Sequence, residues 1–398
     1  MESTWPHGQI PSSQLPYHTL RSLPVPSLLI QSTQLLHFVA SAAHPAPMAS
    51  FPPPHVVEDI PELLQVFSDG TVVRSAYTYP LPIPTPPPGQ PVVHWKDVVY
   101  DASHDVCKLR VYKPHASSYP SGDKLPVIVY YHGGGYIMGS FEMPCFHNCC
   151  LRLAGELPAV VLSADYRLAP EHPLPAGIDD AANVLRWVRG QAVAEAEDAD
   201  PWLAELADFG RVFVAGDSGG GGVVHHTAVR LASGQVGRLD PVRVAGHVLL
   251  FPLFGGEERT ASELELPPGQ FLSLPVTDKG WRILLPPGST RDHPFANPFG
   301  PDSPAMDSLP LPPMLVVVAE YDLLCDRAAD YVARLKAMGK SAELVKFQGQ
   351  DHGFFSVDPY GDAGSEVVRL IKRFVHDNGG VAASYVSLCV SQVTVAVC

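Results

Sequence analysis

The amino-acid sequence predicts an α/β fold in which a mostly parallel central sheet is flanked by helices. One observation is that short, β-branched apolar runs alternate with longer segments of helical periodicity. Another is that two of these runs end in glycine-rich turns, which are typical of a strand that turns sharply. With 398 residues, 46% of them hydrophobic, the chain can bury one large core.

The predicted elements follow this alternation along the chain. The predicted strands cover residues 95–100, 108–112, 127–131, 159–164, 211–215, 244–251, 314–319 and 343–347. The predicted helices cover residues 145–156, 178–193, 219–232, 326–338 and 365–377. An additional amphipathic helix is predicted over Val56–Phe67, before a proline-rich connector at residues 76–92.

The composition divides the chain into three parts. Residues 1–54 are rich in Pro, Ser and His, and we expect an extension that is disordered or precedes the usual start at Met48. Residues 55–378 form the α/β domain, with a cap from residues 55–92 and part of 255–312. Residues 379–398 form an apolar tail.

The second glycine-rich turn, Gly216-Asp217-Ser218-Gly219-Gly220, predicts a nucleophile. A G-x-S-x-G sequence alone is a weak signal, because a tight turn in any glycine-rich loop has the same letters. Here it follows a strand and precedes a helix, which is the setting of a nucleophile elbow. We therefore predict that Ser218 is exposed on a sharp strand-to-helix turn.

The first glycine-rich turn, His132-Gly133-Gly134-Gly135, predicts a site for negative charge. It follows the apolar run Leu125–Tyr131. Such a loop offers backbone N–H groups to the oxyanion that forms when a serine attacks a carbonyl. His132 is expected to orient this backbone and not to transfer protons.

A serine hydroxyl needs a base, and the base needs an acid that holds it. Asp322 stands just past the predicted strand at residues 314–319, and His352 follows the predicted strand at 343–347. Because the carboxyl ends of parallel strands share one edge of a sheet, these residues should meet Ser218 there. The sequence therefore predicts a Ser218–Asp322–His352 triad.

Other residues are weaker candidates for the acid and the base. Glu320 is an alternative acid, whereas Asp326 suits the N-cap of the next helix and Asp351 suits the shaping of its loop. His225 and His226 lie on the helix after Ser218, which is the wrong chain order for the base.

These motifs resemble the hormone-sensitive-lipase-like branch of the α/β-hydrolases, and within it the plant carboxylesterases. The resemblance covers roughly residues 55–378 and rests on the motifs at residues 132–135, 165–173, 216–220, 322–324 and 351–355. Segments 255–260 and 291–300 resemble one plant subgroup. The resemblance implies an α/β-hydrolase fold with an N-terminal cap or lid.

The resemblance also implies roles for particular residues. It implies the same triad, with oxyanion donors from the backbone of Gly133, Gly134 and Gly219. Gly222 departs from the family elbow, which usually carries an asparagine there, and this change affects the start of the helix.

The segment Asp165–Pro173 is expected to form a loop close to the site that fixes its structure without taking part in the chemistry. Asp165, Arg167 and Glu171 are predicted to form buried, paired charges that pin this loop.

Charge and motifs exclude several partners. The 27 Lys and Arg residues against 41 Asp and Glu residues leave a net charge of −14, which argues against nucleic acid and anionic membranes. The apolar stretch Leu23–Ala43 is interrupted by polar residues and is a poor membrane span. No nucleotide-binding motif is present, and we expect no cofactor. The sequence does not indicate an oligomeric state.

The seven cysteines, an odd number without framework spacing, favour reduced thiols and a cytoplasmic location. Targeting by residues 1–47 is the alternative. Cys145, Cys149 and Cys150, near His147, are read as the buried face of a helix and not as metal ligands.

These observations predict a serine carboxylesterase that hydrolyses small carboxylic esters, with a plant metabolite or a hormone such as a strigolactone as a candidate substrate. The alternatives on the same fold are a gibberellin-type receptor, which lacks the catalytic histidine, and a dehydratase, which carries threonine at the nucleophile. The presence of His352 and Ser218 argues against both.

Overall fold

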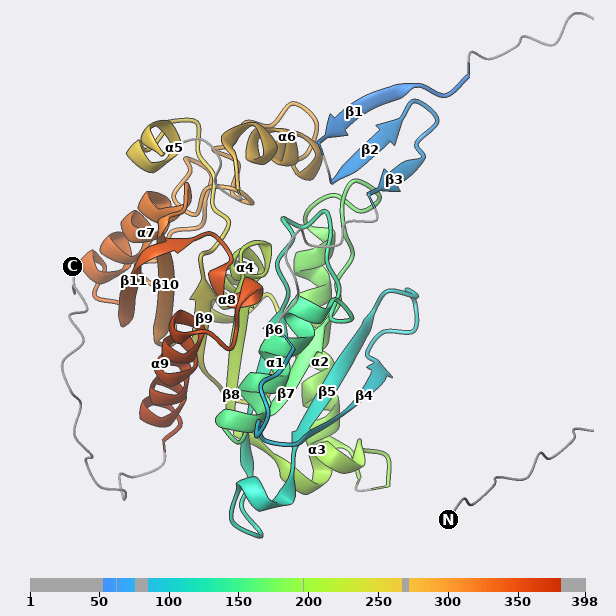
Figure 1. Cartoon of the computed structure of the whole chain (residues 1–398), viewed down its shortest axis with the longest axis vertical. Helices are drawn as coiled ribbons and strands as arrows, with labels where there is room; N and C mark the ends of the chain where they lie inside the picture. Colours follow the sequence, from blue (N-terminus) through green and yellow to red (C-terminus); the bar gives the residue numbers. More distant parts are fainter. Residues whose placement is uncertain (1–52, 62, 76–84, 196, 267–271, 381–398) are drawn as a thin grey trace, which may run out of the picture. The chain divides into compact units, whose positions relative to one another are not determined.

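The computed structural model describes residues 53–61, 63–75, 85–195, 197–266 and 272–380. The predicted extension before residue 53 and the tail after residue 380 lie outside the described residues. In the described part, a central sheet has the strand order β11-β10-β9-β8-β6-β7-β5-β4 (Figure 1). The strands from β11 to β7 in this order are parallel, and β5 and β4 are antiparallel to their neighbours.

The strands confirm the predicted apolar runs. They are β4 (Val93–Val99), β5 (Lys108–Pro114), β6 (Leu125–Tyr131), β7 (Val160–Ala164), β8 (Ala207–Asp217), β9 (Val244–Leu250), β10 (Met314–Tyr321) and β11 (Ala342–Asp351). Residues of β6, β7, β9, β10 and the second half of β8, from Val212 to Asp217, are almost all buried, because both faces of the sheet are covered. Continuous apolar runs are typical of strands in such a position.

Helices cover both faces of this sheet. The helices are α1 (Pro144–Glu156), α2 (Ala176–Val193), α3 (Pro201–Leu206), α4 (Gly219–Ala232), α5 (Ala261–Glu265), α6 (Leu274–Leu284), α7 (Cys325–Ala337), α8 (Phe354–Val357) and α9 (Asp362–Asn378). The core on one face includes α2, α4 and α7, and the core on the other includes α1 and α9. The short helices α3, α5, α6 and α8 were not predicted.

The predicted helix over Val56–Phe67 is wrong. The segment forms β1 (Val56–Ile60) and β2 (Leu64–Phe67), which pair with β3 (Val72–Arg74) in a separate antiparallel sheet. Ile60 and Leu64 are buried opposite each other across the hairpin. Their spacing of four also fits one face of a helix, but Pro61 between them suits a turn better than a helix interior.

The cysteines of the predicted helix at residues 145–156 lie in α1. Cys145, Cys149 and Cys150 are buried and unoxidised, and burial raises the pKa of each thiol. Across the described ranges, no three His, Cys, Asp or Glu residues are grouped as metal ligands, and no helix is long and apolar enough to cross a bilayer. The cytoplasmic location stays a prediction.

Candidate active site

Ser218 lies on a sharp turn between β8 and α4. Its backbone has φ 52° and ψ −116°, a strained conformation for a residue with a side chain. The turn needs glycines because a Cβ atom at Gly216 or Gly220 would come closer than 3.0 Å to backbone oxygens, including that of Tyr131. The strand-to-helix elbow predicted from the sequence is therefore present, with Ser218 at the N-terminus of α4.

His352 links Ser218 to Asp322. Its Nε2 lies 2.9 Å from Ser218 Oγ, and its Nδ1 lies 2.8 Å from Asp322 Oδ2. Asp322 Oδ1 accepts a hydrogen bond from the amide of Leu324 at 2.9 Å, which fixes the carboxylate. The structure thus brings the three predicted triad residues into one hydrogen-bonded chain, and both His352 and Asp322 are buried.

The protonation of His352 is set by opposing effects. Burial lowers its pKa, but the charge and hydrogen bond of Asp322, together with the charges of Asp217 and Asp351, raise it above the usual 6.5 overall. An imidazole stabilised in this way accepts a proton readily when a neighbouring hydroxyl loses one.

The alternative acids have other partners. Glu320 accepts a hydrogen bond from the amide of Gly349 at 2.7 Å. Asp326 accepts from the amide of Ser262 at 2.8 Å and lies in the first turn of α7, whose N-cap is Leu324. The expectation that Asp326 caps this helix is therefore wrong.

The loop His132–Gly135 lies directly against the elbow. A Cβ atom at Gly219 would stand 3.0 Å from the amide nitrogens of Gly135 and Tyr136. Gly134 and Gly135 have φ angles of 106° and 61°, which glycine adopts without steric cost. In the described part of the chain, the amides of Gly134, Gly135 and Gly219 donate to no acceptor, so they are free to meet negative charge beside Ser218.

Gly133 differs from the sequence-based expectation. Its backbone N–H faces the carboxylate of Asp217 and lowers the pKa of that carboxyl, and a Cβ atom at Gly133 would stand 2.6 Å from Asp217 Oδ2. The Gly133 amide is therefore directed toward Asp217, and the unpredicted Gly135, whose amide nitrogen lies 3.0 Å from a Cβ built on Gly219, is the better-placed donor.

Asp217 connects the parts of the site. Its carboxylate also accepts hydrogen bonds from Tyr130 Oη at 2.8 Å and Ser356 Oγ at 3.0 Å. Burial raises the pKa of Asp217 to about 6, although these hydrogen bonds and His352 oppose the increase. Since Tyr130 is the penultimate residue of β6, just before the oxyanion loop, and Ser356 follows the histidine loop, this one side chain fixes both loops relative to the elbow.

His132 is buried and stacks on Tyr166, with the ring centroids 4.5 Å apart. Its Nδ1 lies 2.7 Å from the carbonyl oxygen of Gly133, and burial lowers its pKa to about 4. A neutral, buried imidazole in contact with its own loop agrees with the predicted role in orienting the backbone.

The predicted charge cluster at Asp165, Arg167 and Glu171 is only partly correct. Arg167 pairs with buried Asp180 at 2.7 Å, as expected for a buried pair. Glu171 pairs instead with Arg74 of β3, and its side chain is 41% exposed. Each of these partners lies far away in the sequence or on another element, so the pairing could not be read from the motif.

Asp165 pairs with no arginine among the described residues. It accepts hydrogen bonds from Ser140 Oγ at 2.8 Å and from the amide of Phe141 at 2.7 Å. Burial raises its pKa to about 7. Asp165 therefore holds the chain that leaves the oxyanion loop.

An apolar pocket of about 160 Å³ opens onto Ser218 and His352. Its walls are mainly aliphatic and aromatic, and they include Leu63, Ile137, Met138, Leu253, Trp281 and Leu284. Asp217 is the one acidic side chain among the described residues that line it, and none of those residues is Lys or Arg. The pocket thus suits an uncharged, compact group.

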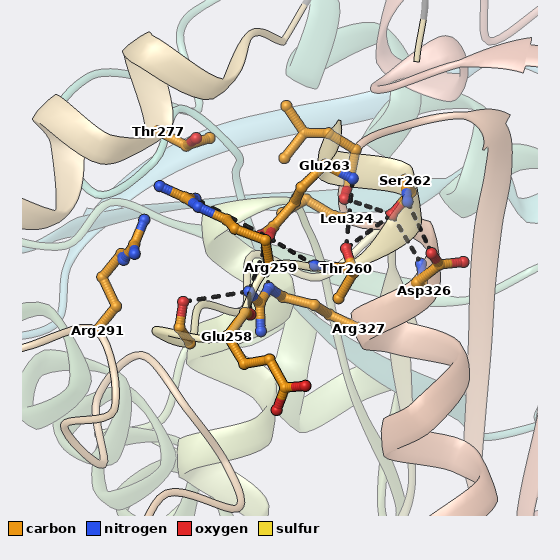
Figure 2. A network of polar contacts seen from close by, with 12 residues as sticks. Glu258, Arg259, Thr260, Ser262, Glu263, Thr277, Arg291, Leu324, Asp326 and Arg327 are labelled. Atoms are coloured by element: carbon orange, nitrogen blue, oxygen red, sulfur yellow. Dashed lines mark hydrogen bonds and ion pairs between the residues drawn. The ribbon is translucent and has the colours of Figure 1, made fainter. Parts of the chain in front are cut away.

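One wall of this pocket is helix α6, which is held by ion pairs on its other side. Asp278 of α6 contacts Arg259 at 2.6 Å and also pairs with Arg291 at 2.5 Å, and Figure 2 shows both arginines beside α6. Glu263 of α5 pairs with Arg327 of α7 at 2.7 Å. This network ties the pocket wall to the core and joins the two segments, 255–260 and 291–300, noted in the sequence.

The same network reaches the loop that carries the acid. Ser262 Oγ donates to the carbonyl oxygen of Leu323, next to Asp322, at 2.9 Å. The capping box between Thr260 and Glu263 fixes the start of α5, so that Ser262 is presented to this loop. A capping box was recognisable from the letters Thr260-Ala-Ser-Glu263, but its contact with the acid loop was not.

Comparison with known proteins agrees with this geometry. A model of the α/β hydrolase fold matches residues 128–356. The chain is 36% identical to the 3-O-acetylpapaveroxine carboxylesterase of Papaver somniferum, over 70% of this chain and 86% of that protein. It is 38% identical to a gibberellin receptor of Arabidopsis thaliana, over 65% of this chain and 74% of the receptor.

Among solved structures, a hyperthermophilic esterase from the archaeon Pyrobaculum calidifontis superposes with a TM-score of 0.60 at 32% identity. The match covers 72% of this chain and 87% of the esterase. The chain therefore belongs to the α/β-hydrolase fold family, as a carboxylic ester hydrolase of the carboxylesterase type.

Proposed function

We propose that the protein is a serine carboxylesterase that acts through a covalent acyl-enzyme on Ser218. The observation that carries the proposal is the hydrogen-bonded chain from Ser218 Oγ through His352 to Asp322. As Ser218 Oγ attacks the ester carbonyl carbon, His352 Nε2 takes the hydroxyl proton. Asp322 keeps the proton of the imidazole on Nδ1 and stabilises the imidazolium.

The tetrahedral intermediate then collapses with loss of the alcohol. His352 returns its proton to the leaving alcohol oxygen, and the acyl group stays on Ser218. Water enters, loses a proton to His352 and attacks the acyl carbon, which releases the acid and restores the serine. Each bond that is formed or broken is accounted for by the ester, water and these two side chains.

The oxyanion is stabilised by the amides of Gly134, Gly135 and Gly219. Each such donor contributes roughly 3–4 kcal/mol to the stabilisation of the transition state. The N-terminus of α4, directly after Ser218, adds a partial positive charge.

The pocket supports a class of substrate. An apolar cavity of about 150 Å³ accommodates a group the size of benzene, so the 160 Å³ pocket fits an acyl group of about six carbon atoms. The charge of Asp217 and the absence of Lys and Arg among the described lining residues disfavour a carboxylate in this pocket. The substrate is therefore an uncharged ester, for which a neutral plant metabolite or a strigolactone-like hormone is a candidate.

Esterase activity separates this proposal from a non-catalytic receptor, the function named for one of the relatives. A receptor binds its ligand without turnover, whereas an esterase releases acid and alcohol. A dehydratase releases water without hydrolysing an ester.

The test is hydrolysis of p-nitrophenyl esters with acyl chains of two to twelve carbon atoms. We expect turnover of the short esters, a steep decrease in kcat/KM beyond about six to eight carbon atoms, and weak activity on an ester with a carboxylate in the acyl chain. Ser218→Ala should abolish turnover with an unchanged circular dichroism spectrum. The matched control is Ser233→Ala at the other end of α4, where the hydroxyl donates to Arg230 O within the described part of the chain.

Full activity of Ser218→Ala would refute the nucleophile. Ligand binding without any turnover by the wild-type protein would favour the receptor.

A further inference from the structure

The hydroxyl group of Tyr136 has no role in the chemistry above, yet it is buried. Tyr136 follows Gly135 directly, and only 1% of its surface is exposed. Its Oη has no hydrogen-bond partner among the described residues. A buried hydroxyl without a partner costs free energy, so its retention calls for a physical reason.

This hydroxyl lies against the first turn of α4, at the position of Gly222. A Cβ atom built on Gly222 would come closer to Tyr136 Oη than the 3.0 Å that real Cβ atoms keep. It would also stand 3.3 Å from Tyr136 Cζ and 3.2 Å from the carbonyl oxygen of Leu253. The amide of Gly222 donates to Ser218 O at 3.1 Å, so Gly222 belongs to the turn that carries the nucleophile. The tyrosine hydroxyl thus occupies the space of the side chain that Gly222 lacks.

The ring of Tyr136 is not free to swing away from α4. It packs edge to face on Tyr166, with centroids 6.1 Å apart and an interplanar angle of 66°. Its backbone has φ 61° and is fixed by the hydrogen bond from the amide of Ala169 to Tyr136 O. A larger residue at position 222 therefore moves Tyr136 together with the backbone of the oxyanion loop.

We propose that Tyr136 and Gly222 are a matched pair of positioning residues that sets the distance between the oxyanion loop and the nucleophile elbow. Tyr136 acts as a spacer between the two loops, because its backbone adjoins the Gly135 amide and its side chain contacts the turn after Ser218. Gly222, which has no side chain, leaves the space that the Tyr136 hydroxyl occupies. The catalytic part of this inference rests on the proposed esterase function.

The test is a double-mutant cycle of Gly222→Ala, Tyr136→Phe and the two combined. Gly222→Ala should displace the oxyanion amides and lower kcat about 10- to 100-fold, with little change in KM. In the double variant, removal of the hydroxyl oxygen relieves the shortest of these contacts, while those with Leu253 O and Tyr136 Cζ stay tight, so a clear part of the lost kcat should return. Gly190→Ala on α2 is the control, since a Cβ atom there meets nothing within 4 Å.

The melting temperature of each variant is measured alongside. Gly222→Ala should melt at a lower temperature than the wild type, and the double variant should recover, whether or not the protein is an esterase. This arm separates the two proposals: if the wild type has no esterase activity, the proposed function fails while the packing of the pair is still tested.

Several outcomes would overturn the proposal. One is a Gly222→Ala protein with wild-type kcat and melting temperature. Another is a decrease in melting temperature with unchanged kcat below the transition, which would make the pair structural only. A third is a double variant that is no more active or stable than Gly222→Ala.

Discussion

Replacing Asp322 by asparagine keeps the shape of the acid but reverses the hydrogen-bonding role that it offers to His352. In the wild type, Asp322 Oδ1 accepts from the Leu324 amide at 2.9 Å and Oδ2 faces His352 Nδ1 at 2.8 Å. An asparagine must place its oxygen at the Leu324 amide, which turns its NH₂ group toward His352. The imidazole then accepts at Nδ1 and carries its proton on Nε2, the atom that faces Ser218 Oγ.

An Nε2 that already carries a proton cannot take one from the serine. The expected loss in kcat is about 10⁴-fold, which corresponds to roughly 5.5 kcal/mol at 1.36 kcal/mol for each factor of ten. The assay is steady-state hydrolysis of p-nitrophenyl butyrate, with stopped-flow detection of the acylation burst. The burst phase should slow together with kcat, because the serine proton is lost in acylation.

The matched control is Glu320→Gln. Glu320 lies two residues before the acid but contacts the amide of Gly349 and not His352. We expect its kcat to stay within about threefold of the wild type. An Asp322→Asn protein within tenfold of the wild type, or an equal loss in Glu320→Gln, would refute the assignment of the acid.

Further predictions concern pH, the pocket wall and the core. His352 must be neutral to act as the base, and its pKa is raised above 6.5. We therefore expect kcat/KM to fall as the pH falls through a value above 6.5. A flat profile of kcat/KM from pH 5.5 to 8 would contradict this. Asp278→Asn should loosen α6 and raise KM about fivefold, which corresponds to a loss of about 1 kcal/mol in substrate binding. Asp330→Asn, which breaks the exposed pair with Arg334, is the control and should leave KM unchanged. His247→Leu should raise the free energy of unfolding by about 1–3 kcal/mol, because both ring nitrogens of this buried histidine lack partners among the described residues. Burial lowers the pKa of His247 to about 4, so between pH 6.5 and 4 the unfolded chain binds a proton that the folded protein excludes, and wild-type stability decreases as the pH falls. Urea titrations at pH 7 and 5 should therefore show a smaller decrease in stability for His247→Leu than for the wild type. An equal decrease would count against the account.

The central sheet and the Ser218–Asp322–His352 triad were predictable because the sequence patterns that indicate them are local. The apolar run Met314–Ala319 is continuous, since this strand is buried on both faces. Asp322 comes directly after β10, and His352 comes directly after the partly exposed edge strand β11. The hairpin at residues 56–67 was mistaken for a helix because Ile60 and Leu64 are four residues apart, a spacing that a helix face and a tight hairpin share.

The supporting contacts were not predictable because each depends on residues far apart in the chain. The sequence around Gly133 does not indicate that its amide faces Asp217, 84 positions later. It therefore does not indicate that Gly135 is the freer donor. The fit of Tyr136 against Gly222 likewise depends on the close approach of two loops. Such contacts are decided by three-dimensional packing, which periodicity and spacing do not encode.

The most direct test of the central claim is mass spectrometry of the protein trapped during turnover. Wild-type protein that is mixed with a short p-nitrophenyl ester and quenched in acid should carry one acyl group, on the peptide that contains Ser218. The acyl group should be absent from Ser218→Ala. Turnover without an adduct at Ser218, or an acyl group carried on another residue, would contradict the acyl-enzyme mechanism.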